Sequence, residues 1–307
     1  MRHSSHAVPV ATCYHLASVA NTLFALCDTP TLRGSWSLSL SMTNSNSMHD
    51  AAHKTETVRA GRRVAALMRH GHFPRPENTA SAHLALSLSD EGREQSEAAA
   101  DVLLGFASAN GLVIDPYVES SPLLRAYETA TVVVDALKRR TDTAFDITNR
   151  DELIERGLGS CANLRFDEIE SLLARDPRIG PLPSGWWRIP DFQLPVPGAE
   201  SLRMAGERTA ARIDESLASI DLNEPTSRLR LFVAHAGCLR HAAFVRGVLS
   251  LENAVNVSME FAQIVLFEIN SDGQWVQLAG NWKKRITAAQ DPKSKAPIDR
   301  ANQEPAL

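Results

Sequence analysis

From residue 63 onward, short apolar runs alternate with longer stretches in which apolar residues recur every three or four positions. The short runs are typical of strands buried on both faces, and the longer stretches are typical of amphipathic helices. Strands that alternate with helices predict a mostly parallel sheet covered on both faces, a three-layer α/β/α sandwich. The pattern predicts strands at 63–68, 113–118, 145–147, 229–234, 264–269 and 274–278, and helices at 90–109, 123–138, 201–217 and 239–249.

Residues at the ends of these segments support the pattern. Ser89 and Ser201 are expected to cap helices, because a serine hydroxyl can accept a hydrogen bond from a free backbone N–H. Asn110 and Gly111 are typical of a helix end. The sequence 271–273, Ser-Asp-Gly, predicts a hairpin between the last two strands.

The two ends of the chain differ in composition from its middle. Residues 1–58 are rich in Ser, Thr, Asn and His and show no sustained periodicity. This is typical of a disordered leader or of a start site assigned too far upstream. We expect one domain over 59–285 and a polar C-terminal tail over 286–307.

Composition limits the classes of function. The 307 residues are 44% hydrophobic and 22% charged, with a formal net charge of −4, which is typical of a soluble globular protein. A weakly acidic chain is a poor nucleic-acid binder, and no run of 18 apolar residues predicts a membrane span. None of the four cysteines has Cys-x-x-Cys spacing, so we expect free thiols, no structural zinc and a cytoplasmic protein.

Two predicted strands end in similar sequences. One ends in Arg69-His70-Gly71 and the other in His235-Ala236-Gly237, about 165 residues later. Ligands of open α/β sheets bind outside the carboxyl ends of the strands, so both histidines are expected at one edge. Arg125, just inside the helix after another strand, is expected to reach the same cavity.

This set of side chains suits phosphoryl transfer. Guanidinium groups match the oxygens of a phosphoryl group, and a neutral imidazole is a competent nucleophile toward phosphorus. Surrounding positive charge lowers the pKa of the attacking histidine and keeps it neutral. The second histidine, when protonated, can donate to the phosphoryl oxygens. The arginines supply the charge that a magnesium ion would bring, so we expect no metal and no cofactor.

Leu67-Met68-Arg69-His70-Gly71 resembles the signature of the histidine phosphatase superfamily, which is also called phosphoglycerate mutase-like. The chain resembles the branch that lacks a His-Asp pair, because Ala236 follows His235. The resemblance covers about residues 62–282. Further segments match in order at 88–95, 120–130, 152–159, 197–201 and 233–237.

The resemblance implies a role for each matching residue. His70 would be the nucleophile that becomes phosphorylated, and Arg69, Arg125 and His235 would complete the phosphate pocket. Glu155 would protonate the leaving alcohol and then activate water. A carboxyl group beside an anionic substrate is expected to have a raised pKa, which suits an acid.

Several positions depart from the family pattern or allow two interpretations. His72 follows the signature where the family usually has Glu or a small polar residue, and Trp187 lies in a Pro-rich segment that is either a packed flap or an aromatic lid. His72 and Trp187 are therefore candidate substrate contacts. Glu200 is interpreted as part of a helix start. Cys238 is interpreted as a small buried hydrophobe.

These observations favour a metal-independent phosphomonoester hydrolase. One alternative is a phosphoglycerate mutase-type phosphotransferase, although Arg165 is the only basic residue in 160–167, where the mutases carry several. A second alternative is a non-catalytic protein that binds a phosphorylated ligand. The expected partner is a small phosphorylated substrate or a phosphoprotein, and the oligomeric state is left open, a homodimer included.

Overall fold

A seven-stranded sheet forms the centre of the computed structural model, which describes residues 61–80, 83–221 and 226–285. The strand order is β4-β3-β5-β1-β7-β8, and β2 also pairs with β5. Strands β1 to β5 pair in parallel, whereas β7 and β8 are antiparallel. The strands are β1 Arg63–Arg69, β2 Val113–Ile114, β3 Tyr117–Ser120, β4 Asp146–Asn149, β5 Arg228–Ala234, β7 Ile264–Ile269 and β8 Trp275–Ala279, and a separate ribbon pairs β6 Val257–Ser258 with β9 Lys283–Lys284.

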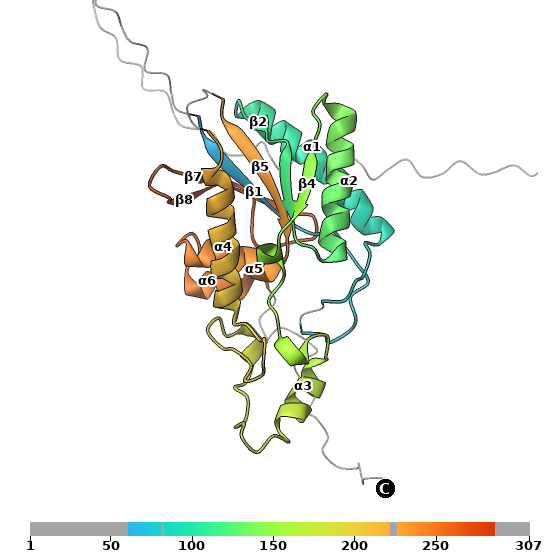
Figure 1. Ribbon diagram of the computed structural model, residues 1–307, viewed down its shortest axis with the longest axis vertical. Helices are drawn as coiled ribbons and strands as arrows, with labels where there is room; N and C mark the ends of the chain where they lie inside the picture. The colour runs from blue at the N-terminus through green and yellow to red at the C-terminus, as the bar shows by residue number, and fades with distance from the viewer. Residues whose placement is uncertain (1–60, 81–82, 222–225, 286–307) are drawn as a thin grey trace, which may run out of the picture. The chain divides into compact units, whose positions relative to one another are not determined.

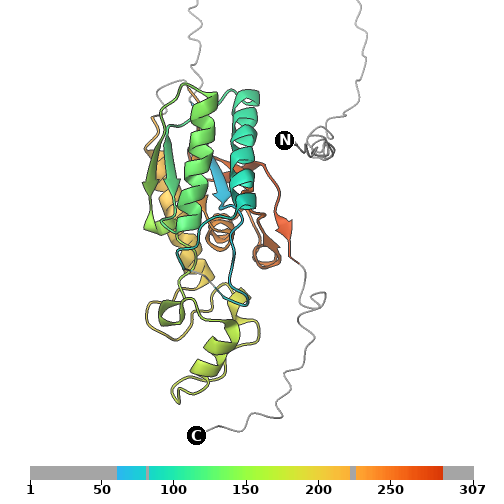
Figure 2. The ribbon, with the colours of Figure 1, turned by 90° about the vertical axis from the view of Figure 1, so that its right-hand side faces the viewer.

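Helices cover both faces of this sheet, which confirms the predicted three-layer α/β/α architecture. Helices α1 and α2 lie side by side on one face, and α4 and α5 lie on the other (Figures 1 and 2). The helices are α1 Asp90–Ala109, α2 Leu124–Arg140, α3 Phe166–Leu173, α4 Leu202–Ala218, α5 Ala236–Val245 and α6 Leu251–Asn256, and single 3₁₀ turns are η2 Asp151–Leu153, η3 Gly159–Cys161 and η4 Trp186–Arg188.

The alternation of side chains along β1 explains its continuous apolar run. Val64 and Met68 belong to the core under α1 and α2, whereas Leu67 belongs to the core under α4 and α5. Successive side chains of a strand point to opposite faces, so a strand between two helical layers needs apolar residues at every position.

Helix starts agree with the prediction, and one strand differs from it. The hydroxyls of Ser89 and Ser201 accept hydrogen bonds from the N–H groups three residues later, each at 3.1 Å. The predicted strand 113–118 is divided into β2 and β3. Asp115 accepts a hydrogen bond from the N–H of Tyr117 at 2.9 Å, and Pro116, between them, has no N–H for the ladder.

The last predicted helix also differs in its bounds. It begins at Ala236 rather than at residue 239, with His235 as its N-cap residue. It ends at Val245, followed by Gly247 with φ +75°. Gly247 adopts this left-handed conformation without the Cβ clash that other residues meet there, and a separate helix, α6, follows.

The segment 151–200 lies beyond the carboxyl end of the strands, on the side where α3 is labelled in Figure 1. It has a small apolar core of its own, which includes Leu158, Ile169 and Trp186. Helix α3 belongs to this core and was not predicted, because its eight residues are too few for a clear helical period.

The predicted domain 59–285 contains all the described residues, and the predicted leader 1–58 and tail 286–307 lie outside them. Within the described part of the chain, no helix combines the length and the apolar character that a membrane crossing requires.

Candidate active site

The register between β1 and β5 brings the two histidines together. Arg69 is paired with Ala234, so the next residues, His70 and His235, leave the sheet side by side. The N–H of His70 donates to the carbonyl oxygen of Ala234 at 3.0 Å, and the two imidazole centroids are 5.0 Å apart. Parallel pairing thus joins residues 165 positions apart at one edge of the sheet.

The hydrogen bonds of His70 determine its tautomer. Its Nδ1–H donates to the carbonyl oxygen of Gly71 at 2.8 Å. Its Nε2 accepts from Nε–H of Arg125 at 3.3 Å, since a guanidinium N–H can only donate. Burial, followed by the positive potential of His235, Arg125 and Arg69, holds the pKa of His70 well below its usual range. His70 is therefore neutral, with the lone pair on Nε2.

Gly71 is required by close packing of the signature against α1. A Cβ atom at this position would overlap the carbonyl oxygen of Gly92 in the first turn of that helix. The N–H of Gly71 also donates to the hydroxyl of Thr129 at 2.9 Å. This contact fixes the signature to α2, the helix that carries Arg125.

His235 lies between Arg125 and Ser121. Nη2–H of Arg125 donates to His235 Nδ1 at 3.3 Å, so the ring proton is on Nε2, which lies 2.9 Å from the hydroxyl of Ser121. Burial, and then the charge of Arg125, lowers the pKa of His235 well below its usual range. The groups of the protein itself therefore favour the neutral imidazole of His235 rather than the protonated form expected from the sequence.

Aromatic rings support the two arginines of the phosphate pocket. The Arg69 guanidinium lies 3.8 Å from the ring centroid of Phe261, and that of Arg125 lies 4.7 Å from the ring centroid of Phe73. Arg69 also donates to the carbonyl oxygen of Met259 at 2.6 Å. Burial lowers the pKa of each arginine to about 10, so both are charged at neutral pH.

Glu155 is bound by backbone N–H groups at the start of α5. Its carboxylate accepts from Gly237 at 3.0 Å, from Cys238 at 3.1 Å and from the adjacent Arg156 at 3.0 Å. A Cβ atom on Gly237 would overlap this carboxylate, which explains the glycine. Helix N-termini are sites for anions because their first N–H groups are free.

In the protein alone, these contacts give Glu155 a lowered pKa, whereas the expected raised pKa was for Glu155 beside an anionic substrate. Burial alone would raise the pKa of Glu155, but the N–H groups of Arg156 and Gly237 and the charge of Arg240 outweigh it and lower the value to about 2. The protein itself therefore holds this carboxyl group ionised at neutral pH.

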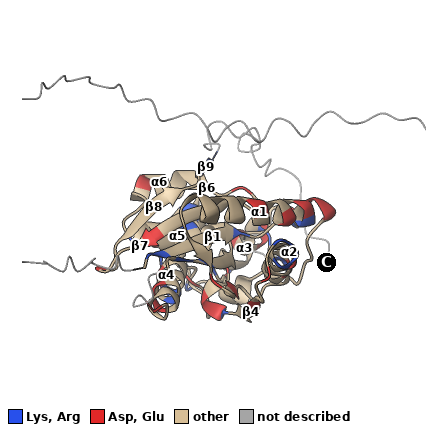
Figure 3. Ribbon diagram, turned by 90° about the horizontal axis from the view of Figure 1, so that it is seen from above, with Lys and Arg blue, Asp and Glu red and all other residues tan. Residues whose placement is uncertain are grey.

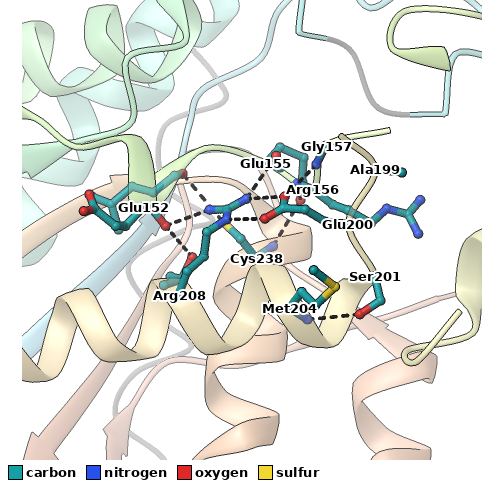
Figure 4. Close-up of polar contacts among 12 residues, drawn as sticks. Glu152, Glu155, Arg156, Gly157, Ala199, Glu200, Ser201, Met204, Arg208 and Cys238 are labelled. Atoms are coloured by element: carbon teal, nitrogen blue, oxygen red, sulfur yellow. Dashed lines mark hydrogen bonds and ion pairs between the residues drawn. The ribbon is translucent and has the colours of Figure 1, made fainter. Parts of the chain in front are cut away.

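Glu200 and Arg208 hold the loop that carries Glu155 (Figure 4). The Glu200 carboxylate accepts from the N–H of Gly157 at 2.9 Å and from Arg208 at 2.8 Å. Arg208 also donates to the carbonyl oxygen of Glu152 at 2.8 Å. The helix-start interpretation of Glu200 is therefore wrong: the adjacent serine caps α4, and Glu200 binds the loop.

His70, Glu155, Arg69 and Arg125 line a cavity of about 80 Å³, whereas His235 is not among its lining residues and contacts it through Arg125. The residues that line it are Arg69, His70, Phe73, Arg75, Ala80, Arg125, Glu155 and Ala236. Arg75 and Phe73 were not predicted as site residues from the sequence. The basic residue between two prolines was the available signal.

The two candidate substrate contacts, His72 and Trp187, are not among the residues that line this cavity. Nδ1 of His72 lies 2.7 Å from the hydroxyl of Ser89, at the start of α1. The ring of Trp187 packs 4.8 Å from that of Phe166, in the small core of the segment 151–200. This geometry favours the packed flap over the aromatic lid.

Cys238 is fully buried, as the sequence predicted, and its sulfur lies near the carbonyl oxygen of His235. Burial, and then the negative charge of Glu155, raises the pKa of the Cys238 thiol to about 12. A thiol in this environment is protonated and unreactive.

The fold and the cavity define a phosphoglycerate mutase-like protein of the phosphatase and mutase class. A family model for the histidine phosphatase superfamily (branch 1) matches residues 65–282, and the chain belongs to this superfamily. This confirms the resemblance on which the sequence roles were based.

Similar proteins include both mutases and phosphatases. A 2,3-bisphosphoglycerate-dependent phosphoglycerate mutase of Parvibaculum lavamentivorans is 26% identical over 211 residues, which are 68% of this chain and 92% of that protein. The structure of mycobacterial glucosyl-3-phosphoglycerate phosphatase is 24% identical with a TM-score of 0.53, over 72% of this chain and 99% of that one. A phosphoglycerate mutase structure from Bacillus anthracis is 15% identical with a TM-score of 0.54, over 72% and 94% of the two chains. These structures share the fold.

Proposed function

We propose that the protein hydrolyses phosphate monoesters through a phosphohistidine on His70. The observation that carries this proposal is the state of His70: its Nδ1 proton is bound to a carbonyl oxygen, and its Nε2 lone pair lies beside Arg125 in the cavity. A neutral imidazole with a fixed tautomer is ready to attack phosphorus, and the adjacent guanidiniums stabilise the charge of the phosphoryl oxygens.

In the first step, Nε2 of His70 forms a bond to phosphorus as the bond from phosphorus to the leaving oxygen breaks. The electron pair of the broken bond goes to the leaving oxygen, which takes a proton from the carboxyl group of Glu155. Arg69, Arg125 and His235 bind the phosphoryl oxygens during this transfer. The products of the step are an alcohol and phosphorylated His70.

In the second step, the carboxylate of Glu155 takes a proton from water, and the water oxygen attacks phosphorus. The phosphorus–nitrogen bond breaks, and its electron pair returns to Nε2 of His70. Inorganic phosphate leaves, and Glu155, whose pKa in the protein alone is about 2, releases the proton to solvent.

The low pKa of Glu155 in the protein alone suits this second step, because a base must be ionised. For the first step, the proton has to come with the substrate. Phosphate monoesters bind with negative charge, and a negative charge beside a carboxylate raises its pKa. We propose that substrate binding thereby transfers a proton to Glu155.

A phosphatase screen with His70→Ala as the control tests the proposal. The panel contains sugar phosphates, nucleotides, phospho-amino acids and phosphoproteins, because the proposed partner is a small phosphorylated substrate or a phosphoprotein. We expect phosphate release from at least one member and none from the variant. Wild-type protein quenched during turnover should contain acid-labile, base-stable phosphate on His70.

If folded wild-type protein releases phosphate from none of the panel substrates, the proposal is overturned and a phospho-ligand binder is favoured. A binder would still bind its ligand after His70→Ala. A mutase, favoured by the Parvibaculum lavamentivorans relative, would return a phosphate isomer of its substrate instead of free phosphate. Chromatography of the products therefore separates the three functions.

Glu155→Gln tests the proton-transfer role. Glutamine keeps the size of the side chain but cannot exchange a proton, so we expect turnover of alkyl phosphates to fall by about 10² to 10⁴. With p-nitrophenyl phosphate, whose leaving group needs no proton, the first step should survive and phosphorylated His70 should accumulate. Equal losses on both substrates, without accumulation, would contradict this role.

A further inference from the structure

Ser121 lies against the histidine that follows β5. Its hydroxyl oxygen is 2.9 Å from Nε2 of His235, and its side chain is fully buried. The sheet places it there, because Ser120 is paired with Val233 and the N–H of Ser121 donates to the carbonyl oxygen of Val233 at 2.9 Å. Ser121 therefore leaves β3 at the same edge of the sheet where His235 leaves β5.

The two residues after Ser121 fix its conformation. A proline restricts the residue before it to extended backbone conformations, and Pro122 follows Ser121 directly. The N–H of Leu123 donates to the Ser121 hydroxyl oxygen at 3.3 Å. The hydroxyl group is therefore held by the turn that precedes α2 as well as by the end of β3.

The direction of the hydrogen bond between Ser121 and His235 follows from the other side of the imidazole. Nδ1 of His235 lies 3.3 Å from Nη2 of Arg125, and a guanidinium N–H can only donate. Nδ1 must therefore carry a lone pair, and the ring proton is on Nε2. Nε2–H donates to the Ser121 hydroxyl oxygen, which is the acceptor that this buried N–H needs.

Arg125 extends this line of hydrogen bonds to the nucleophile. Its Nε–H donates to Nε2 of His70 at 3.3 Å, and Nδ1–H of His70 donates to the carbonyl oxygen of Gly71 at 2.8 Å. Arg125 thus donates to both imidazoles, and each imidazole donates its own N–H to an acceptor on its far side. Ser121 is that acceptor for His235, as the carbonyl group of Gly71 is for His70.

We propose that Ser121 is a positioning residue for phosphoryl transfer: its hydroxyl fixes the tautomer and the orientation of His235 and, through His235, the orientation of the Arg125 guanidinium. Loss of this acceptor would leave Nε2–H buried without a partner. A proton on Nδ1 instead would point at the N–H of Arg125. Either change disturbs the contact between Arg125 and the nucleophile. This inference rests on the proposed function, which supplies the reaction that the geometry serves.

The hydroxyl of Ser121 suits both charge states of His235. A phosphoryl oxygen can accept a hydrogen bond from Nδ1 only after this nitrogen has gained a proton, and Nε2 then still carries its own. Ser121 accepts from Nε2–H before and after that gain. It therefore holds the ring in place while the partner of Nδ1 changes from Arg125 to the phosphoryl group.

Ser120 provides a matched control. It is as fully buried as Ser121, but its hydroxyl donates to the carbonyl oxygen of Ser121 at 3.1 Å rather than to an imidazole. Successive side chains of an extended chain point in opposite directions, so adjacent serines have different neighbours. Ser120→Ala and Ser121→Ala therefore remove the same group from adjacent buried positions, and only the second removes the acceptor of His235.

Nuclear magnetic resonance measures the tautomer of His235 directly. Long-range proton–nitrogen correlation spectra of protein with isotope-labelled histidine show which ring nitrogen is protonated, and His235→Gln assigns the signals. We expect the proton on Nε2 in the wild type and in Ser120→Ala, and a mixture of tautomers or a proton on Nδ1 in Ser121→Ala. An unchanged pattern in Ser121→Ala, or the same change in both variants, would overturn the positioning role.

Phosphate release measures the consequence for the reaction. On the best substrate of the panel, Ser121→Ala should lower kcat and kcat/KM together by about 10- to 100-fold, the range expected when a buried N–H loses its acceptor. Ser120→Ala should stay within about twofold of wild type. A change confined to KM, or equal losses in the two variants, would overturn the role.

The two measurements separate this inference from the proposed function. If folded wild-type protein hydrolyses no ester, the proposed function fails, and the spectra of His235 still decide whether Ser121 fixes its tautomer. If esters are hydrolysed but the tautomer does not depend on Ser121, only this inference fails.

Discussion

Arginine side chains are buried near both ends of strand β5, but the two clusters differ in their balance of positive and negative charge. At its start, Arg230 is paired with Asp115 at 3.0 Å, and the nearby Glu119 is paired with Arg212 at 2.7 Å. At its end, beyond His235, the charges of Arg69, Arg125 and Arg240 act on a single buried carboxylate, Glu155. The same strand thus connects a charge-balanced cluster with a charge-unbalanced one.

The difference separates a structural role from a binding role. Seen from above, the ribbon as a whole shows acidic and basic residues intermixed (Figure 3). Arg230 there also donates to the hydroxyl of Ser216 at 2.9 Å and is paired with Asp115, although its Nε has no hydrogen-bond partner among the described residues. Positive charge that the protein leaves uncompensated is available to an anionic substrate.

The largest expected effect is on stability. Arg230→Met would leave Asp115, which is 3% exposed, as a buried unpaired charge, and should lower the free energy of unfolding by about 3–5 kcal/mol. Arg240→Met removes a charge that forms no direct ion pair among the described residues, and should change the free energy of unfolding by no more than about 1 kcal/mol. Urea unfolding at pH 7 measures both. Equal losses would contradict the distinction between the clusters.

The second effect is on catalysis and has the opposite pattern. Arg125→Gln removes donors to the phosphoryl oxygens and should lower kcat/KM by about 10² to 10³. Arg230→Met, measured on its folded fraction, should stay within about threefold of wild type, because Arg230 lies near the end of β5 opposite to His235. Initial rates of phosphate release, normalised by circular dichroism, give the comparison. A large loss of activity in Arg230→Met would connect the two clusters functionally.

The third effect is stabilisation by an anion. Inorganic phosphate at a hundredfold excess over its Kd should stabilise the wild type by about 2.7 kcal/mol, because it binds only the folded state. Thermal melts across a phosphate titration should show the same increment for Arg230→Met and a smaller one for Arg125→Gln. If phosphate stabilises Arg125→Gln as much as it stabilises the wild type, the bound phosphate lies outside the cavity.

The fourth effect is the pH dependence of stability. Burial holds the pKa values of His70 and His235 well below 6.5 and lowers that of His241 to about 3. Below pH 6.5 these histidines bind protons in the unfolded chain but not in the folded protein. Proton binding therefore favours the unfolded state, and stability falls as pH falls. Each contributes up to about 1.4 kcal/mol per pH unit. Unfolding between pH 7.5 and 5 should show this slope, and His241→Asn should reduce it. A flat profile would contradict neutral buried histidines.

The smallest expected effect concerns the packed flap. Trp187→Ala removes a ring from the core of segment 151–200 and should leave kcat/KM within about twofold of wild type on each active substrate. Steady-state kinetics with the best panel substrates measure it. A decrease of kcat/KM by tenfold or more would instead support the interpretation of Trp187 as part of an aromatic lid.

Much of the phosphate pocket could be predicted because it depends on local rules. His70 and His235 each follow an apolar strand, and parallel strands place their carboxyl ends at one edge. Ser89 and Ser201 begin helices through hydrogen bonds to residues three positions away. Such features depend only on residues that are close together in the sequence.

The leaving-group side could not be predicted in the same way. The low pKa of Glu155 depends in part on N–H groups of α5. The role of Glu200 depends on Gly157 and on Arg208 of α4. The backbone N–H of Arg285 donates to the carbonyl oxygen of Asn256 only because β6 pairs with β9. Short loops without periodicity carry these residues, so their partners have no local signature.

The sequence by itself determined the superfamily, the layered sheet and the four residues that we propose bind a phosphoryl group, because strand periodicity and strand ends follow from short-range chemistry. Only the tertiary structure decided the protonation of Glu155 and of His235. Ionisation and charge balance depend on distances between groups far apart in the chain, and these distances exist only after the chain has folded.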